Sequence, residues 1–239
     1  KDVIIIGGGQ AGCEAAHASA NLARNVALIT LTKNGIGQMS CNPAIGGIGK
    51  SHLAREIDAM DGLMCKIADL SALQRRKLNA RKGPAVQATR IQTCRDTYKS
   101  RMQDSIFKNP NIHVVEAMVS SLIIKNNRVI GVKTGLDNNE LYSDSVVLTT
   151  GTFLGGRIHI GDKSFSAGRA GDEASNQLEE FFIKEGFKIG RLKTGTPPRI
   201  LKSSINFSDL QSQPSDIDLP HLSYLHDQYA ATCETTREI

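Results

Sequence analysis

The sequence lacks paired cysteine motifs. Its cysteines are odd in number, none stands in a CxxC arrangement, and no CxxxxC redox pair follows the first glycine-rich segment. Disulfide frameworks and zinc sites usually show regular, paired spacing. The scattered cysteines therefore argue against a disulfide framework and against a zinc site, and we expect no metal site. They favour a reducing, cytoplasmic location. The five cysteines are Cys13, Cys41, Cys65, Cys94 and Cys233.

Long apolar runs are also missing. No stretch approaches the roughly 20 apolar residues of a membrane-spanning helix, and we see no signal peptide, internal repeat or low-complexity tract. The 239 residues suffice for one or two domains. The chain starts at Lys1 directly before an apolar run and shows no stop signal at its far end, so we expect part of a longer protein.

Charge leaves two interpretations open. The net charge of +5 and the isoelectric point near 9.0 suit a polyanionic partner, but they also suit a mildly basic enzyme. Basic residues gather at 75–77, at 81–82, and at Arg90 and Arg95, a band that could follow a phosphate backbone. Solvated surface residues explain any single one of them equally well. At residues 193–199, two prolines and a glycine fix a loop that carries two cations and two hydroxyls, which suits an anionic ligand.

The first thirty residues predict a βαβ unit. Apolar runs at 3–6 and 26–29 flank a helix expected over 13–23, and a complete GxGxxG fingerprint opens that helix. In this motif Gly7 permits the turn, Gly9 lets a pyrophosphate approach the backbone, and Gly12 allows close helix–strand packing. A tight turn without a ligand is the alternative. We expect the cofactor to contact Gly7, Gly8, Gly9, Gln10, Ala11 and Gly12.

The end of the second strand departs from the fingerprint. An acidic residue there usually binds the ribose hydroxyls, but this strand runs into Thr30. A hydroxyl can still hydrogen-bond a ribose, without a charge-assisted contact. We therefore expect Thr30 to be the ribose contact.

Further periodic segments complete an α/β pattern. We expect a Rossmann-like parallel sheet with helices on both faces, an inserted antiparallel hairpin or meander, and a loop-rich second region. The dinucleotide-binding domain would span 1–200, and 201–239 would begin an inserted NAD-binding or substrate region; residues 203–220 are expected to form an exposed loop. Helices are expected at 52–63 and 89–107, buried strands at 112–115 and 145–149, and a hairpin from 119–125 and 128–134.

The strand expected at 145–149 bears on which dinucleotide is bound. It runs into small residues and Gly151, and flavoproteins with two dinucleotide sites place a similar element close to FAD. Together with the hairpin before it, this favours FAD over NAD. An ordinary buried strand with a glycine turn is the alternative.

Residues 37–50 place Cys41 in a polar, glycine-rich segment. A lone cysteine is more often a small buried hydrophobe than a nucleophile. Burial is not expected beside so many glycines, however, and a helix starting after Pro43 would favour the thiolate. Cys41 is thus the candidate nucleophile. Cys233, in a polar segment, is a weaker second candidate.

Several segments together resemble the GidA/MnmG family, FAD-dependent enzymes that install carboxymethylaminomethyl groups on the wobble uridine of tRNA. The likeness spans residues 2–207 and fades afterwards; the run at 37–50 alone is nearly a family signature. Family proteins are much longer, so the chain would be the N-terminal FAD-domain portion. The other matching segments are 2–9, 78–86, 147–153, 159–161, 168–172 and 191–199.

The resemblance implies a reaction. NADH would reduce FAD, and a one-carbon unit from methylenetetrahydrofolate would pass to uridine C5, with glycine or ammonium supplying nitrogen. Cys41 matches a family cysteine and Cys233 resembles the second; Val119 and Ser175 match positions that contact FAD. Uracil C5 is a poor nucleophile until a group adds at C6, which suits a thiolate. Family members are homodimers that act with the GTPase MnmE in a heterotetramer.

Two other functions remain open. A folate- and FAD-dependent tRNA uracil-C5 methyltransferase shares the chemistry but leaves a methyl group; the segments at 37–50 and 193–199 favour the first interpretation. A non-catalytic flavin module, acting as a redox sensor or scaffold, would not need Cys41.

Overall fold

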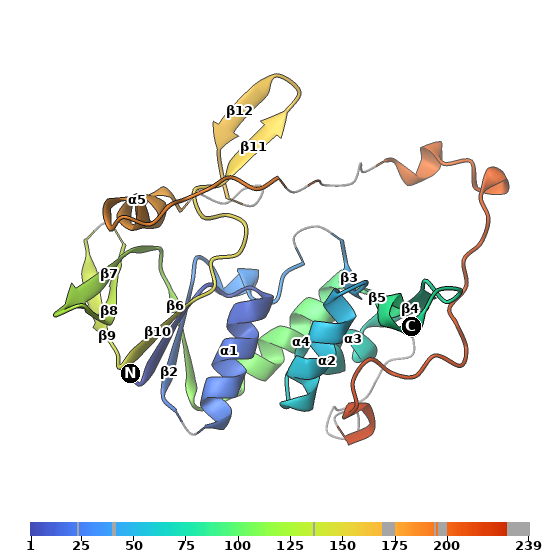
Figure 1. Ribbon diagram of the computed structural model, residues 1–239, viewed down its shortest axis with the longest axis horizontal. Helices are drawn as coiled ribbons and strands as arrows, with labels where there is room; N and C mark the ends of the chain where they lie inside the picture. Colours follow the sequence, from blue (N-terminus) through green and yellow to red (C-terminus); the bar gives the residue numbers. More distant parts are fainter. Residues whose placement is uncertain are drawn as a thin grey trace. The chain divides into compact units, whose positions relative to one another are not determined.

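The computed structural model describes residues 1–22, 24–39, 42–135, 137–168, 175–193, 195 and 200–228. Its contacts divide the chain into two compact units (Figure 1). Unit 1 comprises Lys1–Gln38 and Lys99–Arg191, and unit 2 comprises Met39–Tyr98 and the residues from Leu192 onward. The expected division into domains at 1–200 and 201–239 stays a prediction.

A four-stranded parallel sheet forms the centre of unit 1. Strand order is β10-β1-β2-β6, and Val3 lies opposite both Val26 and Ser145. Helix α1 (Gln10–Asn21) connects β1 to β2, so the predicted βαβ unit is confirmed. The helix begins three residues earlier than expected because Gly9, inside the glycine turn, is already its N-cap. The strands are β1 (Val3–Ile6), β2 (Val26–Thr30), β6 (Ile112–Glu116) and β10 (Ser145–Leu148).

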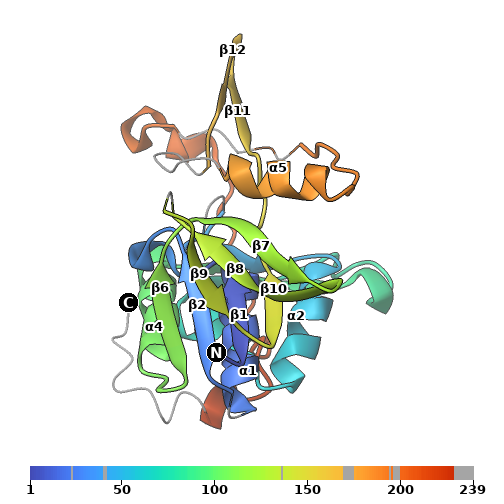
Figure 2. The same ribbon diagram turned by 90° about the vertical axis from the view of Figure 1, so that its left-hand side faces the viewer.

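The two faces of this sheet are covered differently. Small buried residues of α1, including Ala16 and Ala20, face the sheet on one side. An antiparallel sheet of β7 (Val119–Lys125), β8 (Arg128–Thr134) and β9 (Asn139–Tyr142) covers the other side, as Figure 2 shows. The α/β class and the inserted meander are thus confirmed, but a sheet stands where a second helical layer was expected. The shared core contains Ile4, Ile6, Ala27, Ile29, Val119, Val132 and Leu178.

The β7–β8 connection follows directly from its two turn residues. Asn126 and Asn127 adopt φ values of 51° and 56°. Two consecutive left-handed residues define the type I′ turn that matches the twist of a hairpin, and asparagine tolerates this conformation better than most residues. The predicted hairpin is confirmed.

Strand β10 was predicted to be buried, and this was wrong. Among the described residues it lies at the edge of the sheet, where it pairs with β1. Val147 and Leu148 are 37% and 39% exposed. An apolar run predicts a strand, but it does not say which position in the sheet the strand takes.

Two further elements extend unit 1. The hairpin of β11 (Arg157–Ile160) and β12 (Lys163–Ser166) was not predicted, because its pattern is too short and polar to signal strands. Helix α5 (Asn176–Lys184) contacts β7 through buried Leu178.

Unit 2 contains a three-stranded antiparallel sheet and two helices. Strand order is β3 (Ala44–Gly46), β5 (Ala88–Thr93), β4 (Ala72–Leu78). Helix α2 (Lys50–Ala59) ends earlier than predicted, and helix α3 (Met64–Leu70) was not anticipated.

The helix predicted over 89–107 was wrong in its first part. Those residues form most of β5, and helix α4 (Arg95–Phe107) begins only afterwards. Thr89, Ile91 and Thr93 alternate along β5 and are buried. β-Branched residues at every second position pack well in a sheet, and pairing with β4 decides the conformation.

The described residues between 200 and 228 are mostly exposed, as predicted for 203–220, yet two places attach them to unit 2. They include the short 3₁₀ turns η3 (Lys202–Ser204) and η4 (Phe207–Asp209). Asp216 lies along β4, where its N–H donates to Arg75 O (2.9 Å) and its carboxylate accepts Lys77 N–H (2.7 Å). Further along, Asp58 and Asp69 accept backbone N–H groups of residues 222–224.

Candidate functional site

The glycine turn after β1 is shaped by close backbone packing. Gly7 adopts a φ of +110°, and a Cβ there would lie 2.3 Å from Thr149 O. A Cβ on Gly12 would lie 1.7 Å from Gly7 O. The Thr149 hydroxyl donates toward the carbonyls of Ile6 (2.7 Å) and Gly7 (3.1 Å) and so ties the end of β10 to the turn. At Gly7 and Gly12 no other residue fits.

Gly9 is different, because space lies open above it. A Cβ on Gly9 would meet no atom within 4 Å, and its φ of −75° suits any residue. No side chain caps the helix at Gly9. The first-turn N–H groups of a helix have no intrahelical acceptors and carry a partial positive charge. Open space at this helix end fits the pyrophosphate of a dinucleotide, so the residues present suit FAD.

The other predicted contacts lie around the carboxyl edge of the same sheet. Thr30 ends β2; it is 8% exposed, and its hydroxyl donates to Thr32 O (3.3 Å). Val119 begins β7 two residues after Ala117, whose N–H donates to Thr30 O (2.9 Å). The Val119 side chain is buried in the core, so a contact with a ligand would have to come from its backbone.

Gly151 and Ser175 follow later in unit 1. Gly151 comes shortly after β10, with a φ of +65° and open space around it. Ser175 is the N-cap of α5 and its carbonyl accepts Gly155 N–H (3.2 Å). Their roles as FAD contacts, like those of the other named residues, stay predictions.

Gly37 is a neighbour of the turn that the fingerprint does not include. Its N–H donates to Gly8 O (3.1 Å), and Gln10 Nε2 donates to its carbonyl (3.3 Å). At a φ of +69°, a Cβ there would lie 2.6 Å from Met102 Cβ. The glycine-rich run was noted, but no spacing rule links it to a motif so much earlier in the chain.

Both candidate nucleophiles, Cys41 and Cys233, lie outside the described residues, as does most of the 193–199 loop. The neighbours of Cys41 are described. Thr93 Oγ1 donates to Met39 Sδ (3.3 Å) and to Pro43 O (3.1 Å), and Thr93 N–H also donates to Pro43 O (2.7 Å). After Pro43 the chain enters β3, and α2 begins only at Lys50, so the condition under which a helix terminus would favour the Cys41 thiolate is not met.

Two arginines of the basic band lie close to carboxylates of the same unit. Arg75 Nη2 lies 3.7 Å from Asp69 Oδ1, and Arg76 Nε lies 3.7 Å from Asp216 Oδ1. Arg81 and Lys82 are exposed in the turn between β4 and β5. A polyanion would therefore find them more available than the two paired arginines.

The described thiols differ in their environments. Burial raises the pKa of the Cys13 thiol to about 12. Cys65 is 1% exposed, and its thiol donates to Ala54 O (3.3 Å). Cys94 directly precedes α4, where hydrogen bonds from the hydroxyl and then the N–H of Thr97 lower the pKa of its thiol.

We therefore expect Cys94 to react with iodoacetamide at neutral pH at least about tenfold faster than Cys13 or Cys65, since only the thiolate reacts. Timed alkylation with peptide mass spectrometry measures each site separately. Denaturant should equalise the three rates. Equal rates in the folded chain would contradict these assignments.

A strand, a glycine turn and a helix arranged in this way are those of the dinucleotide-binding class of α/β proteins. The sequence profile of the family "Glucose inhibited division protein A" matches residues 2–238. The chain belongs to this family, known as GidA.

Solved structures agree with this assignment. GidA from Aquifex aeolicus in crystal form II is 44% identical with a TM-score of 0.89, covering 95% of this chain and 38% of that one. GidA from the same organism in crystal form I is 45% identical with a TM-score of 0.88, covering 93% of this chain and 37% of that one. The chain thus spans well under half the length of these relatives. A GidA-related protein from Thermus thermophilus shares the fold. It is 22% identical with a TM-score of 0.56, and the match covers 78% of this chain and 69% of that one.

Among the described residues, no helix combines the length and apolar character needed to cross a membrane.

Proposed function

We propose that this chain is the FAD-binding part of an enzyme that modifies C5 of the wobble uridine in tRNA. The observation that carries the proposal is the glycine turn, complete at Gly7, Gly9 and Gly12 and open above Gly9. Membership of the GidA family supports the same conclusion. The product would be a carboxymethylaminomethyl or aminomethyl group.

FAD, when bound, would supply the redox chemistry that moves a one-carbon unit from methylenetetrahydrofolate, with NADH as the reductant. The chain's own residues bind and orient it. The first-turn N–H groups of α1 would face the pyrophosphate, and Thr30 would face a ribose. Gly151 and Ser175 would contact other parts of the cofactor through atoms close to the backbone.

Cys41 would activate the uracil. Its thiolate adds to C6, and the electron pair of the C5–C6 double bond moves toward C5 and O4, which makes C5 nucleophilic. After C5 has taken the one-carbon unit, loss of the C5 proton expels the thiolate and restores the double bond. Cys233 is proposed as a second reactive thiol.

The partners follow from the family and from charge. A net charge of +5 suits tRNA, and exposed Arg81 and Lys82 offer phosphate contacts. We propose a homodimer that acts in the cytoplasm with the GTPase MnmE as a heterotetramer.

Two measurements test the proposal. The purified protein should show the visible absorption of bound flavin, and tRNA from a deletion strain should lack the wobble modification while keeping methyluridine. Loss of methyluridine with intact wobble modification would assign the methyltransferase reaction instead. Intact levels of both nucleosides would leave only a non-catalytic flavin module.

A further inference from the structure

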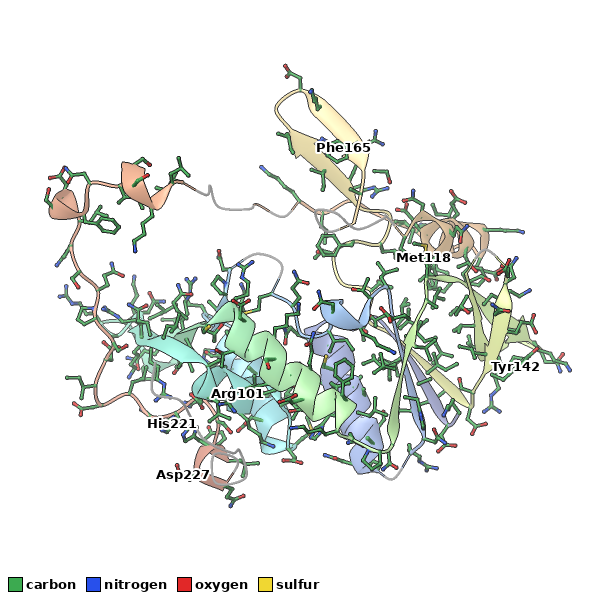
Figure 3. All side chains as sticks on the ribbon, turned by 180° about the vertical axis from the view of Figure 1, so that it is seen from behind. Arg101, Met118, Tyr142, Phe165, His221 and Asp227 are labelled. Carbon is green, nitrogen blue, oxygen red and sulfur yellow. The ribbon has the colours of Figure 1, made fainter. Side chains whose placement is uncertain are left out.

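Three side chains able to bind a metal ion meet within unit 2. They are Asp69 from α3 and His221 and His226 from the segment that Figure 3 shows leading to Asp227. One ligand atom from each lies within 4.8 Å of the other two. Asp69 is far from the histidines in sequence, so only the fold brings the set together.

The ring nitrogens that face Asp69 have no hydrogen-bond partner. His221 Nδ1 lies 3.7 Å from Asp69 Oδ1, and His226 Nδ1 lies 3.9 Å from Oδ2. Both distances exceed those of an N–H···O hydrogen bond. Both nitrogens are nevertheless buried and unsatisfied. A buried polar atom without a partner often marks a bound water or ion.

The two imidazole rings are already paired in space. They stack with centroids 3.5 Å apart and an interplanar angle of 7°. Both Nδ1 atoms therefore lie on the side facing the carboxylate. Ligand atoms about 2.1 Å from one tetrahedral ion are about 3.4 Å apart. The three ligand atoms, which lie within 4.8 Å of one another, must therefore come closer together, and each ring must turn toward the ion.

From this geometry we propose that Asp69, His221 and His226 form a binding site for a divalent transition-metal ion. Two imidazole nitrogens and one carboxylate oxygen suit Zn²⁺ or Fe²⁺. Three protein ligands leave at least one coordination position to water. His221 keeps 38% of its side chain exposed, which gives the ion a route from solvent.

The backbone holds the ligands in place before any ion binds. Asp69 accepts the N–H groups of Leu222 (3.0 Å) and Ser223 (2.8 Å). Asp58, which is 1% exposed, accepts the Ser223 hydroxyl (2.7 Å) and the Tyr224 N–H (2.8 Å). Such outer contacts orient metal ligands and raise affinity.

A neighbouring positive charge limits how tightly the site can bind a cation. Arg75 Nη2, 3.7 Å from Asp69 Oδ1, opposes a second cation. We therefore expect micromolar affinity for zinc rather than the tighter binding of a structural zinc site.

The test uses the chain stripped of metal with a chelator and titrated with ZnCl₂ against a zinc-sensitive dye. One zinc ion should bind per chain. His221→Ala and His226→Ala should each weaken binding at least about tenfold, with circular dichroism confirming that both variants are folded. The matched control is His52→Ala, which removes an exposed histidine of the same unit.

Cobalt identifies the ligands directly. Co²⁺ in this site should give visible ligand-field bands without the near-ultraviolet band of thiolate ligation, and the bands should vanish in His226→Ala. No zinc binding at micromolar concentrations, equal binding by the histidine variants, or a thiolate band would each overturn the proposal. The test needs neither flavin nor tRNA, so its outcome is separate from that of the proposed function.

Discussion

Gly12→Ala is expected to unfold unit 1 or to leave it severely destabilised. The added Cβ would lie 1.7 Å from Gly7 O and 2.8 Å from Thr149 Oγ1. Neither contact can be relieved by rotating a flexible side chain, because the first is a backbone carbonyl and the second is the hydroxyl that holds that same turn. Helix α1 would have to move away from β1 and give up its packing.

The expected cost is about 3–5 kcal/mol, at the upper end of overpacking effects. Domains of this size have only about 5–15 kcal/mol of stability. The unfolding midpoint should therefore fall by roughly 10 °C or more, which thermal unfolding followed by circular dichroism would measure.

Gly9→Ala is the matched control in the same motif. Its Cβ would enter open space at an ordinary φ of −75°, so the unfolding midpoint should change by no more than roughly 3 °C. That Cβ would occupy the position proposed for the pyrophosphate, and flavin affinity should fall at least about 100-fold. Unchanged flavin binding in Gly9→Ala would contradict the proposed cofactor position, whereas a stable Gly12→Ala would contradict the packing.

The parts of the fold that were predicted correctly depend on contacts close in sequence. The βαβ unit has a glycine fingerprint between two apolar runs, and the β7–β8 hairpin has two asparagines suited to its turn. In both cases neighbouring residues determine the local backbone. Such signals are visible without knowledge of the rest of the molecule.

The wrong predictions concern segments whose conformation or burial depends on residues far away in the sequence. Residues 89–93 were assigned to a helix although their alternating β-branched residues fit a strand, and pairing with β4 makes them one. Val147 and Leu148 form an apolar strand that the sheet order places at an edge. The place that a strand takes in its sheet has no local pattern, because it depends on which strands become neighbours.

The candidate sites also differ in whether nearby residues in the sequence reveal them. Gly7, Gly9 and Gly12 were found from spacing alone; the structure gives a packing reason for Gly7 and Gly12 and shows open space at Gly9. Asp69 and His221 could not have been paired from the sequence, because nothing in their spacing resembles a metal motif. The scattered cysteines led us to expect no metal site, but their spacing bears only on cysteine-based sites and not on one built from histidine and aspartate.

Cys41→Ala is expected to abolish wobble-uridine modification while leaving folding and flavin binding intact. The described residues on either side of Cys41 are held by Thr93, which binds Met39 Sδ and Pro43 O. Removing the thiol should therefore not disturb the neighbouring backbone. Without a nucleophile at C6, uracil C5 stays unreactive, and the rate should fall at least about 1,000-fold.

The measurement is nucleoside analysis of tRNA from a strain whose only copy of the gene carries the substitution. The matched control is Cys94→Ala, which removes the described thiol with a lowered pKa and should leave modification unchanged. A second readout is covalent: tRNA with 5-fluorouridine at the wobble position cannot lose fluorine from C5 as it would a proton, so the thioether at C6 should accumulate. A protein–tRNA band that survives denaturation should form with Cys94→Ala and be missing with Cys41→Ala. Normal modification in Cys41→Ala would assign C6 addition to another residue, and Cys233→Ala would then be the variant that abolishes the covalent band.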